Sequence, residues 1–252
     1  MLSQTGLKKT IVMAALLATA GLAVAQKPKS KAEGEAVNAM LQAQNPDDKI
    51  KAVEALLAKY KDTEFKGFAL EQAGEASERK GDSVNAIIYG NRAIEADPKN
   101  YLAMLLVARQ TAVGTHENDL DKDDKVKRTT KLANDAMTTL NSASKINPQW
   151  TDDQWAGFKK EMTGDAHNTL GIINAVDKKF DPAISEFKTS LENNPDPVTM
   201  VRLANTYNRA GKPEDAVAMA DKALASPNLP ESVKKFAAEE KRTSEKLKAG
   251  KN

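Results

Sequence analysis

The stretch that decides the fold is GDSVNAIIYGNRAIEADPKN, residues 81–100, in which Ala86, Ala93 and Pro98 are spaced by seven and five positions. The same spacing recurs further along the chain: Ala136, Ala143, Pro148; Ala183, Ser190, Pro195; and Ala216, Ala223 with Pro227 one residue early. Two antiparallel helices approach to about 8–10 Å only where the side chains between them are small. A proline ends the second helix because its ring cannot continue the backbone hydrogen-bond ladder. The spacing therefore predicts a series of antiparallel helix pairs.

This recurrence resembles the tetratricopeptide repeat from about residue 33 to residue 230. Small residues also lie in the middle of each helix that precedes the first alanine: Ala73-Gly74, Val107-Ala108, Leu170-Gly171 and Leu203-Ala204. Segments 67–100, 164–197 and 197–230 match the family's period of about 34 residues. The resemblance implies an all-α, right-handed solenoid of antiparallel helix pairs.

The central repeat, residues 101–148, departs from this period. Ala86 and Ala136 are 50 positions apart instead of about 34, so the unit carries about 16 extra residues, THENDLDKDDKVKRTT (115–130). About 13 more residues follow the unit before the next repeat begins. We interpret the central repeat as one enlarged by a charged insertion.

The insertion is highly charged and merges into the helix that holds Ala136, and the segment after it has helical spacing of Trp155, Phe158 and Met162. They predict a pair of overlong antiparallel helices, at roughly 120–146 and 152–177. Gly157, Gly164 and Gly171 fall seven apart, on one face of the second helix. We expect that face to let the other long helix approach closely.

The first 25 residues have the layout of a secretory signal peptide. Lys8 and Lys9 precede an apolar run from Ile11, and small residues end the run before Gln26, where we expect cleavage. The run is about 14 residues long, whereas a bilayer span needs roughly 20. The chain has no cysteine, which excludes a lipid anchor at the cleavage site, disulfides and thiol chemistry. We therefore expect export to the periplasm or the exterior, without a transmembrane span after cleavage.

The rest of the chain divides by composition and turn residues. Residues 26–31 predict a disordered leader, and residues 32–66 predict a degenerate helical hairpin. The repeats occupy residues 67–230, and residues 231–252 predict a capping helix and tail. A repeat array needs such an end because its last apolar face would otherwise be open to water.

The mature chain is electrically balanced. Loss of Lys8 and Lys9 with the signal leaves 35 of the 37 basic residues, against 35 acidic residues. Charges of both signs are interspersed, so no overall field attracts nucleic acid or an anionic membrane. We expect neither as a partner.

The sequence offers little for catalysis or for a metal. The two histidines, His116 and His167, have no visible pairing, and the chain has no serine elbow, phosphate-binding glycine loop or paired-histidine motif. Asp119, Asp121 and Asp123 begin like a calcium loop, but Asp124 and Thr130 stand where that loop needs glycine and glutamate. We interpret the acidic run as a helix start. The expectation is a non-enzyme without cofactor or metal.

The two tryptophans, Trp150 and Trp155, are interpreted as packing residues rather than as a binding anchor.

The resemblance implies that the first helix of each pair lines a concave face that receives a peptide or a partner's helix. Carried over by position, the groove residues are Glu71, Glu75, Arg79, Leu105, Arg109, Asn168, Ile172, Asn205, Asn208 and Arg209. Asn, Arg and Glu side chains suit hydrogen bonds to a peptide backbone and to charged groups. Val201 stands where the chaperone-binding members have a clamp lysine, so binding of a C-terminal carboxylate in that manner is not predicted.

These observations favour a non-catalytic scaffold of the cell envelope that binds a protein or peptide. A carrier of a small molecule or glycan that uses the same groove is the alternative, and an accessory domain that acts on an enzyme is a third interpretation. The sequence leaves the partner and the oligomeric state open.

Overall fold

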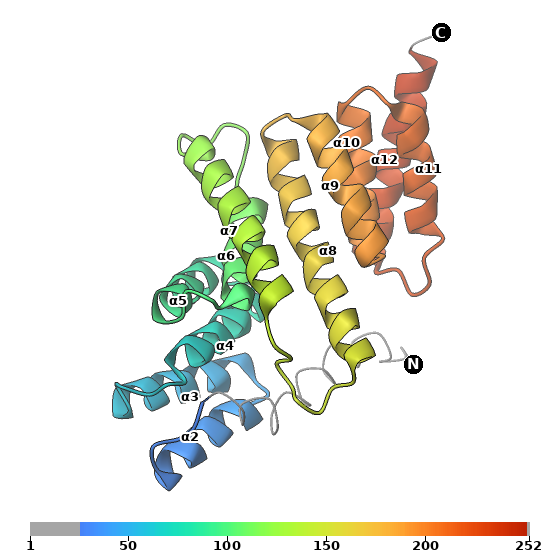
Figure 1. The fold of residues 1–252 in the computed structure, drawn as a ribbon. Coiled ribbons are helices and arrows are strands. Elements are labelled where there is room, and N and C mark those ends of the chain that lie inside the picture. The colour runs from blue at the N-terminus through green and yellow to red at the C-terminus, as the bar shows by residue number, and fades with distance from the viewer. Residues whose placement is uncertain (1–25, 251–252) are drawn as a thin grey trace. The chain divides into compact units, whose positions relative to one another are not determined.

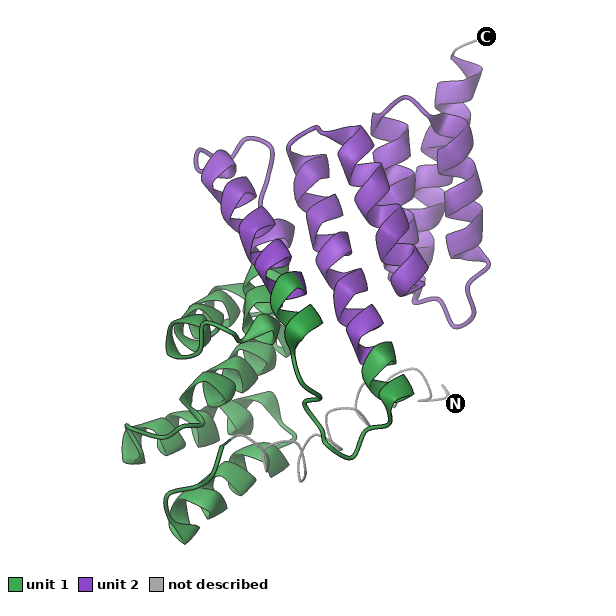
Figure 2. Cartoon of the chain, viewed as in Figure 1, with its two compact units in different colours: residues 1–110, 138–157 green, residues 111–137, 158–252 purple. Residues whose placement is uncertain are grey.

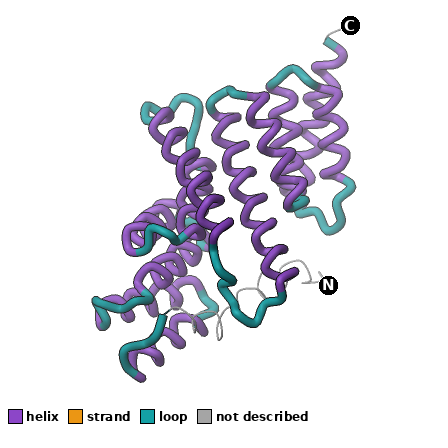
Figure 3. The backbone as a smooth tube through the Cα atoms, viewed as in Figure 1, coloured by secondary structure: helices purple, strands orange, loops and turns teal. Residues whose placement is uncertain are grey.

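A computed structural model describes residues 26–250 of the chain, and the expected signal peptide lies outside these residues. The described part consists of helices joined by short loops, without a strand (Figures 1 and 3). The predicted all-helical class is confirmed. In chain order the helices are α2 (Lys31–Gln42), α3 (Pro46–Lys59), α4 (Lys66–Arg79), α5 (Ser83–Ala96), α6 (Tyr101–Val113), α7 (Lys122–Ser142), α8 (Asp152–Val176), α9 (Phe180–Asn193), α10 (Pro197–Arg209), α11 (Pro213–Leu224) and α12 (Glu231–Ala249).

The chain forms two compact units, drawn in different colours in Figure 2. Among the described residues, unit 1 comprises those up to 110 together with residues 138–157. Unit 2 comprises residues 111–137 and the described residues from 158 onward. The long helices α7 and α8 each contribute to both units.

Unit 1 is built on helices that approach closely at small residues. A Cβ atom added to Gly74 of α4 would lie 2.6 Å from the Leu106 side chain, and one added to Gly90 of α5 would lie 2.5 Å from Val107. Both distances are too short for real atoms, so α6 packs here only because the two positions are glycine. Beneath this contact the core contains fully buried apolar side chains, among them Met40, Val53, Leu56, Phe65 and Leu70.

Unit 2 has its core between α8, α9, α10 and α11, centred on the buried ring of Phe187. A Cβ atom on Gly171 would lie 2.6 Å from that ring, and one on Gly164 would lie 2.9 Å from the Asn194 side chain. The glycine face of α8 therefore packs on α9, the second helix of its own pair. Our expectation that it receives the other long helix is wrong, and Gly157 has no atom within 4 Å of its added Cβ.

Several helices begin where a short polar side chain caps the free amides of the first turn. The Asp82 side chain accepts from the backbone N–H of Asn85 at 3.0 Å, and the Asp196 side chain accepts from the backbone N–H of Thr199 at 2.8 Å. Ser30 caps α2 in the same manner, and helical structure begins at Lys31, the last residue of the expected leader.

Three helix pairs share one turn, in which the chain reverses through a residue of positive φ. The positions are Gly81 (φ 75°), Lys178 (φ 59°) and Gly211 (φ 71°). In each, the next residue donates to a carbonyl five positions back: Asp82 to Ser77, Lys179 to Asn174, Lys212 to Tyr207. Glycine is the usual residue of this helix ending because it has no Cβ. Lys178 is therefore strained.

The last helix, α12, contacts both α10 and α11. Its buried residues are Ala237 and Ser244, while Phe236 stays exposed. No helix among residues 26–250 is long and apolar enough to serve as a membrane span.

Candidate binding cleft

A cleft in unit 2 has a volume of about 450 Å³ and is bordered by α8, α9, α10 and α12. We call it the α10 cleft. Its apolar lining is Ile172, Ala175, Val176, Phe187, Val198, Val201, Val233 and Phe236. Its polar lining is Arg202, Asn205, Thr206, Arg209 and Glu240.

Helix α10 supplies one continuous side of the cleft. Its lining residues follow steps of three or four positions, which place side chains on one helical face. The predicted groove residues Ile172, Asn205 and Arg209 meet in this cleft. Repeat position alone was enough to find these three.

Two apolar side chains of the lining are open to solvent. Phe236 is 65% exposed and Val198 is 37% exposed. Exposed apolar side chains beside a concave, mostly apolar surface make the cleft a candidate site for the burial of a further apolar group.

The guanidinium of Arg202 provides positive charge in the lining. Its Nη1 donates to Asn168 Oδ1 at 3.2 Å, and Thr199 Oγ1 donates to the same oxygen at 3.2 Å. Burial lowers the pKa of Arg202, while Asp196 and Asp165 oppose that shift. An arginine keeps its charge under such conditions, so the cleft retains a half-buried cation that is hydrogen-bonded to a neutral amide.

Glu240 of α12 is held by two asparagines of α10. Asn205 Nδ2 donates to Glu240 Oε1 at 2.8 Å, and Asn208 Nδ2 donates to Glu240 Oε2 at 2.9 Å. Ser244 Oγ in turn donates to Asn208 Oδ1 at 2.7 Å. We predicted that Asn208 faces a partner in the groove. Instead it is buried and holds α12 in position. Sequence could not indicate this, because the contact crosses 32 residues.

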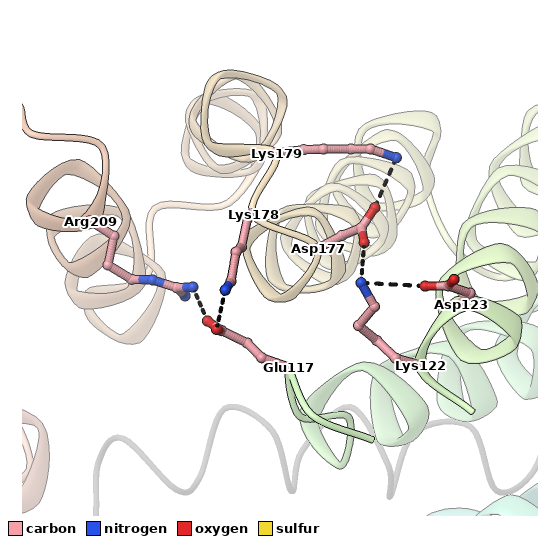
Figure 4. A network of polar contacts seen from close by, with 7 residues as sticks. All are labelled: Glu117, Lys122, Asp123, Asp177, Lys178, Lys179 and Arg209. Atoms are coloured by element: carbon pink, nitrogen blue, oxygen red, sulfur yellow. Dashed lines mark hydrogen bonds and ion pairs between the residues drawn. The ribbon is translucent and has the colours of Figure 1, made fainter. Parts of the chain in front are cut away.

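A network of ion pairs lies at the Arg209 end of α10 (Figure 4). Glu117, from the loop between α6 and α7, pairs with Arg209 and, at 3.2 Å, with Lys178. The Arg209 guanidinium also lies 5.0 Å from the centre of the Phe180 ring. The Lys178 hydrogen bond, together with the charges of Arg209, Lys178 and Lys122, lowers the pKa of Glu117.

A second carboxylate, Asp177, anchors the start of α7. Lys122 Nζ lies 2.7 Å from Asp177 Oδ1, and Lys179 Nζ lies 2.9 Å from Asp177 Oδ2. The hydrogen bonds from both lysines lower the pKa of Asp177. The insertion is thus fixed to the α8–α9 turn through charges of both signs.

Solved structures of repeat proteins match this arrangement of helix pairs. The thermophilic TPR protein TTC0263 from Thermus thermophilus is 16% identical, with a TM-score of 0.56 over 82% of this chain and 98% of that one. MamA from Desulfovibrio magneticus RS-1 is 13% identical, with a TM-score of 0.56 over 78% of this chain and 96% of that one. This is a tetratricopeptide-repeat (TPR) fold.

A further MamA structure is 14% identical, with a TM-score of 0.54 over 76% of this chain and 90% of that chain. No family model and no curated protein matches the chain. At these identities the likeness concerns the TPR fold.

The TPR groove positions of unit 1 do not form a comparable cleft. Glu71 and Leu105 were predicted to face a partner, but both side chains are buried. Glu75 and Arg79 border a cleft of only about 50 Å³. Arg109 is bound by Glu78, through Nε at 2.8 Å and Nη2 at 2.6 Å. Position in a TPR unit indicates a helix face, but neighbouring helices decide which residues of that face stay open.

The acidic run of the insertion is neutralised within the chain. Lys125 Nζ lies 2.9 Å from Asp119 Oδ2 and 2.8 Å from Asp121 Oδ1. Asp119 Oδ2 also accepts from the His116 amide at 3.0 Å. Among residues 26–250 no three His, Cys, Asp or Glu side chains gather as metal ligands would.

His167 has a partner that the sequence analysis missed. Its Nδ1 lies 2.6 Å from Glu186 Oε2 on the next helix. His167 precedes the α8–α9 turn and Glu186 follows it. Because the two helices are antiparallel, residues at similar distances from the turn face each other, and this rule could have suggested the contact. The two tryptophans lie together, with ring centres 6.3 Å apart and Trp155 buried.

Replacing Lys178 with glycine is expected to raise the free energy of unfolding by about 1 kcal/mol, because a non-glycine residue in the left-handed region costs about that much. The lost ion pair with Glu117 is solvent-exposed and does not cancel this gain. Urea unfolding followed by circular dichroism measures the change. Gly81→Ala, at the equivalent turn with φ 75°, is the converse control and should destabilise. A destabilised Lys178→Gly variant would contradict the assignment of strain.

Proposed function

We propose that the protein is a non-catalytic interaction scaffold that binds a peptide or a partner's helix in the α10 cleft. The observation that carries the proposal is the meeting of Ile172, Asn205 and Arg209 in one cleft on the first helices of the repeats. Helices α8, α10 and α12 alternate with α9 and α11 along the chain, and the proposal takes them as the helices whose face the resemblance implies for binding.

The lining suits a polypeptide that brings both apolar and polar groups. Val198, Val201 and Phe236 offer apolar surface, and Arg202 offers hydrogen-bond donors. Amide and guanidinium donors recognise backbone carbonyls and carboxylates, while the apolar wall buries a side chain.

Export and a role in the cell envelope belong to the proposal as well. They are supported by the signal-like layout of residues 1–25. The non-catalytic role is supported by the sequence, which has no serine elbow, phosphate-binding glycine loop or paired-histidine motif.

Photo-crosslinking in the cells that produce the protein tests the proposal. A photoreactive phenylalanine analogue at position 236 is expected to give one defined crosslinked protein, because Phe236 is exposed at the edge of the cleft. The same analogue at position 84 is the matched control, since Val84 is 69% exposed but lies on α5 in unit 1.

The outcome that would contradict the proposal is the absence of a crosslink at position 236. A crosslink to the same protein from position 84 would move the contact away from the cleft. Cell fractionation of the crosslinked species shows whether the partner belongs to the envelope.

A carrier of a small molecule or glycan is the second candidate. The cleft volume of about 450 Å³ falls in the range of small-ligand pockets, roughly 300–1,000 Å³. A small-molecule panel that raises the melting temperature, with no crosslinked protein at position 236, would favour this function.

A further inference from the structure

We propose that Glu117 occupies the position of a partner's carboxylate at Arg209. The α10 cleft then selects a peptide with an acidic residue near an apolar one, and that peptide competes with the insertion loop (residues 114–121). The inference rests on the proposed function and defines the chemistry of the partner.

The chain itself shows a carboxylate bound at the cleft. Arg209 lines the α10 cleft and also pairs with Glu117, which is 92 positions away in sequence. Figure 4 shows the Glu117 side chain directed at Arg209 and Lys178. The guanidinium of Arg209 and the ammonium of Lys178 therefore form a receptor for one carboxylate, made from two separate helix ends.

The loop is held by contacts that can be exchanged. The Glu117 and Arg209 side chains are 37% and 31% exposed, so their pair is accessible to water and to a competing anion. Leu120, the large apolar residue of the loop, is fully exposed and adds nothing to a core. Thr115 is buried, but its hydroxyl donates to the Thr111 carbonyl in the last turn of the preceding helix, α6. Release of Glu117 therefore leaves the core of unit 2 intact.

The strained turn at Lys178 supports the inference that a carboxylate binds between Lys178 and Arg209. The equivalent turns at residues 81 and 211 have glycine, which removes the strain. Lysine at residue 178 costs stability but places an ammonium 3.2 Å from Glu117. Residue 178 is thus a lysine that binds a carboxylate, at a position where glycine would favour the fold.

The remaining charges of the cleft define what a partner must bring. Arg202 and Arg209 are cationic, whereas Glu240, the one acidic residue of the lining, accepts hydrogen bonds from Asn205 and Asn208. The lining thus carries a net positive charge beside an apolar wall. A peptide that combines an apolar side chain with a carboxylate complements both features.

An array of glycine–serine peptides tests the inference. Each peptide carries one leucine or phenylalanine and one glutamate, at every spacing within two helical turns and in both orders. Each has a counterpart with glutamine in place of glutamate. We expect the full mature chain to bind some glutamate members more tightly than their glutamine counterparts. Glu117→Gln should strengthen the binding of those members about threefold to tenfold, because an exposed competing ion pair is removed.

Three variants accompany the test. Asp181→Asn breaks the exposed Asp181–Lys212 pair of the same unit, outside the cleft lining, and should leave peptide affinity unchanged. Arg209→Gln should abolish the preference for glutamate over glutamine. Lys178→Gly removes one of the two contacts that hold Glu117, which favours a competing peptide. It also removes one of the two cations that would bind the peptide's carboxylate. The affinity for glutamate peptides should therefore rise less than it does in Glu117→Gln.

Unchanged affinity in Glu117→Gln, or equal binding of glutamate and glutamine peptides, would overturn the inference. So would the absence of any bound peptide in both proteins. A crosslinked partner at position 236 would in those cases leave the proposed function standing, whereas the absence of that crosslink would remove both. Circular dichroism confirms that each variant is folded.

Discussion

Replacing Phe187 with alanine is expected to lower the free energy of unfolding of unit 2 by about 3–5 kcal/mol. The ring is 1% exposed and forms the centre of the core that also contains Leu203 and Tyr207. Its removal leaves a cavity that the fixed helices cannot fill. Urea unfolding of the whole mature chain, followed by circular dichroism, measures the loss as a lower midpoint for the transition of unit 2.

The same ring explains a second, coupled effect at Gly171. A methyl group there would meet three atoms of the Phe187 ring at 2.6–2.9 Å, so Gly171→Ala is expected to cost about 1–3 kcal/mol through overpacking. With Phe187→Leu in the same chain, the cost of Gly171→Ala should shrink, giving a coupling of at least about 0.5 kcal/mol.

Gly157 provides the matched control for this cycle, because it lies on the same helix and has no atom near an added Cβ. Gly157→Ala should be neutral or stabilising by up to about 1 kcal/mol, as helix propensity requires. Equal costs at residues 157 and 171, or additive effects of the Phe187 and Gly171 substitutions, would contradict the packing of α8 on α9.

Replacing Glu71 with glutamine is expected to stabilise unit 1 by about 1–3 kcal/mol at about pH 8. The Glu71 side chain is 1% exposed, and its Oε1 has no hydrogen-bond partner among residues 26–250. Burial, and then the charge of Glu75, raises the pKa of Glu71 well above its ordinary value of 4.5. Glutamine retains the contact with the Gln72 amide, at 3.1 Å in the native chain, without a charge to bury.

The pH dependence follows from the direction of this shift. A carboxyl whose pKa is raised in the folded state contributes stability that is fully present below the unfolded value, 4.5, and is lost as the pH rises through the folded value. The stability curves of native protein and Glu71→Gln should therefore approach each other near pH 4.5 and diverge above it.

Tryptophan fluorescence is a suitable probe, because Trp150 and Trp155 both belong to unit 1. Glu95→Gln, at an exposed position of α5, is the control. Its stability should have the same pH dependence as that of the native protein. Parallel curves for Glu71→Gln and the native protein would show that Glu71 is charged in the folded state.

The helix pairs could be predicted because their cause is local in sequence. Small residues must lie where two helices approach, and prolines and glycines must lie where they end, so a spacing such as that of Ala86, Ala93 and Pro98 indicates a pair. The long helices α7 and α8 were also expected close to their observed bounds. The partner of the glycine face was not, because periodicity identifies a face and does not say which neighbour covers it.

The site was predicted only in part, for a similar reason. Asn205 and Arg209 were found by repeat position, but Arg202 and Phe236 were missed. Arg202 is neither at a carried-over position nor in a motif, and Phe236 lies in a helix that we expected only to cap the array. The pairing of Glu117 with Arg209 could not be predicted, since many charged residues surround both in sequence and only the fold selects one pair.

The contact between Glu117 and Arg209 also limits how this protein can evolve. Repeat arrays change length when whole units are duplicated or lost, which is tolerated because each unit contacts only its neighbours. Here a unit copied between α8 and α10 would shift Arg209 away from the α8–α9 turn, where Glu117 also contacts Lys178. The contact therefore opposes an added unit between α8 and α10, and we expect repeats to be added or lost more readily beyond α11 than before it.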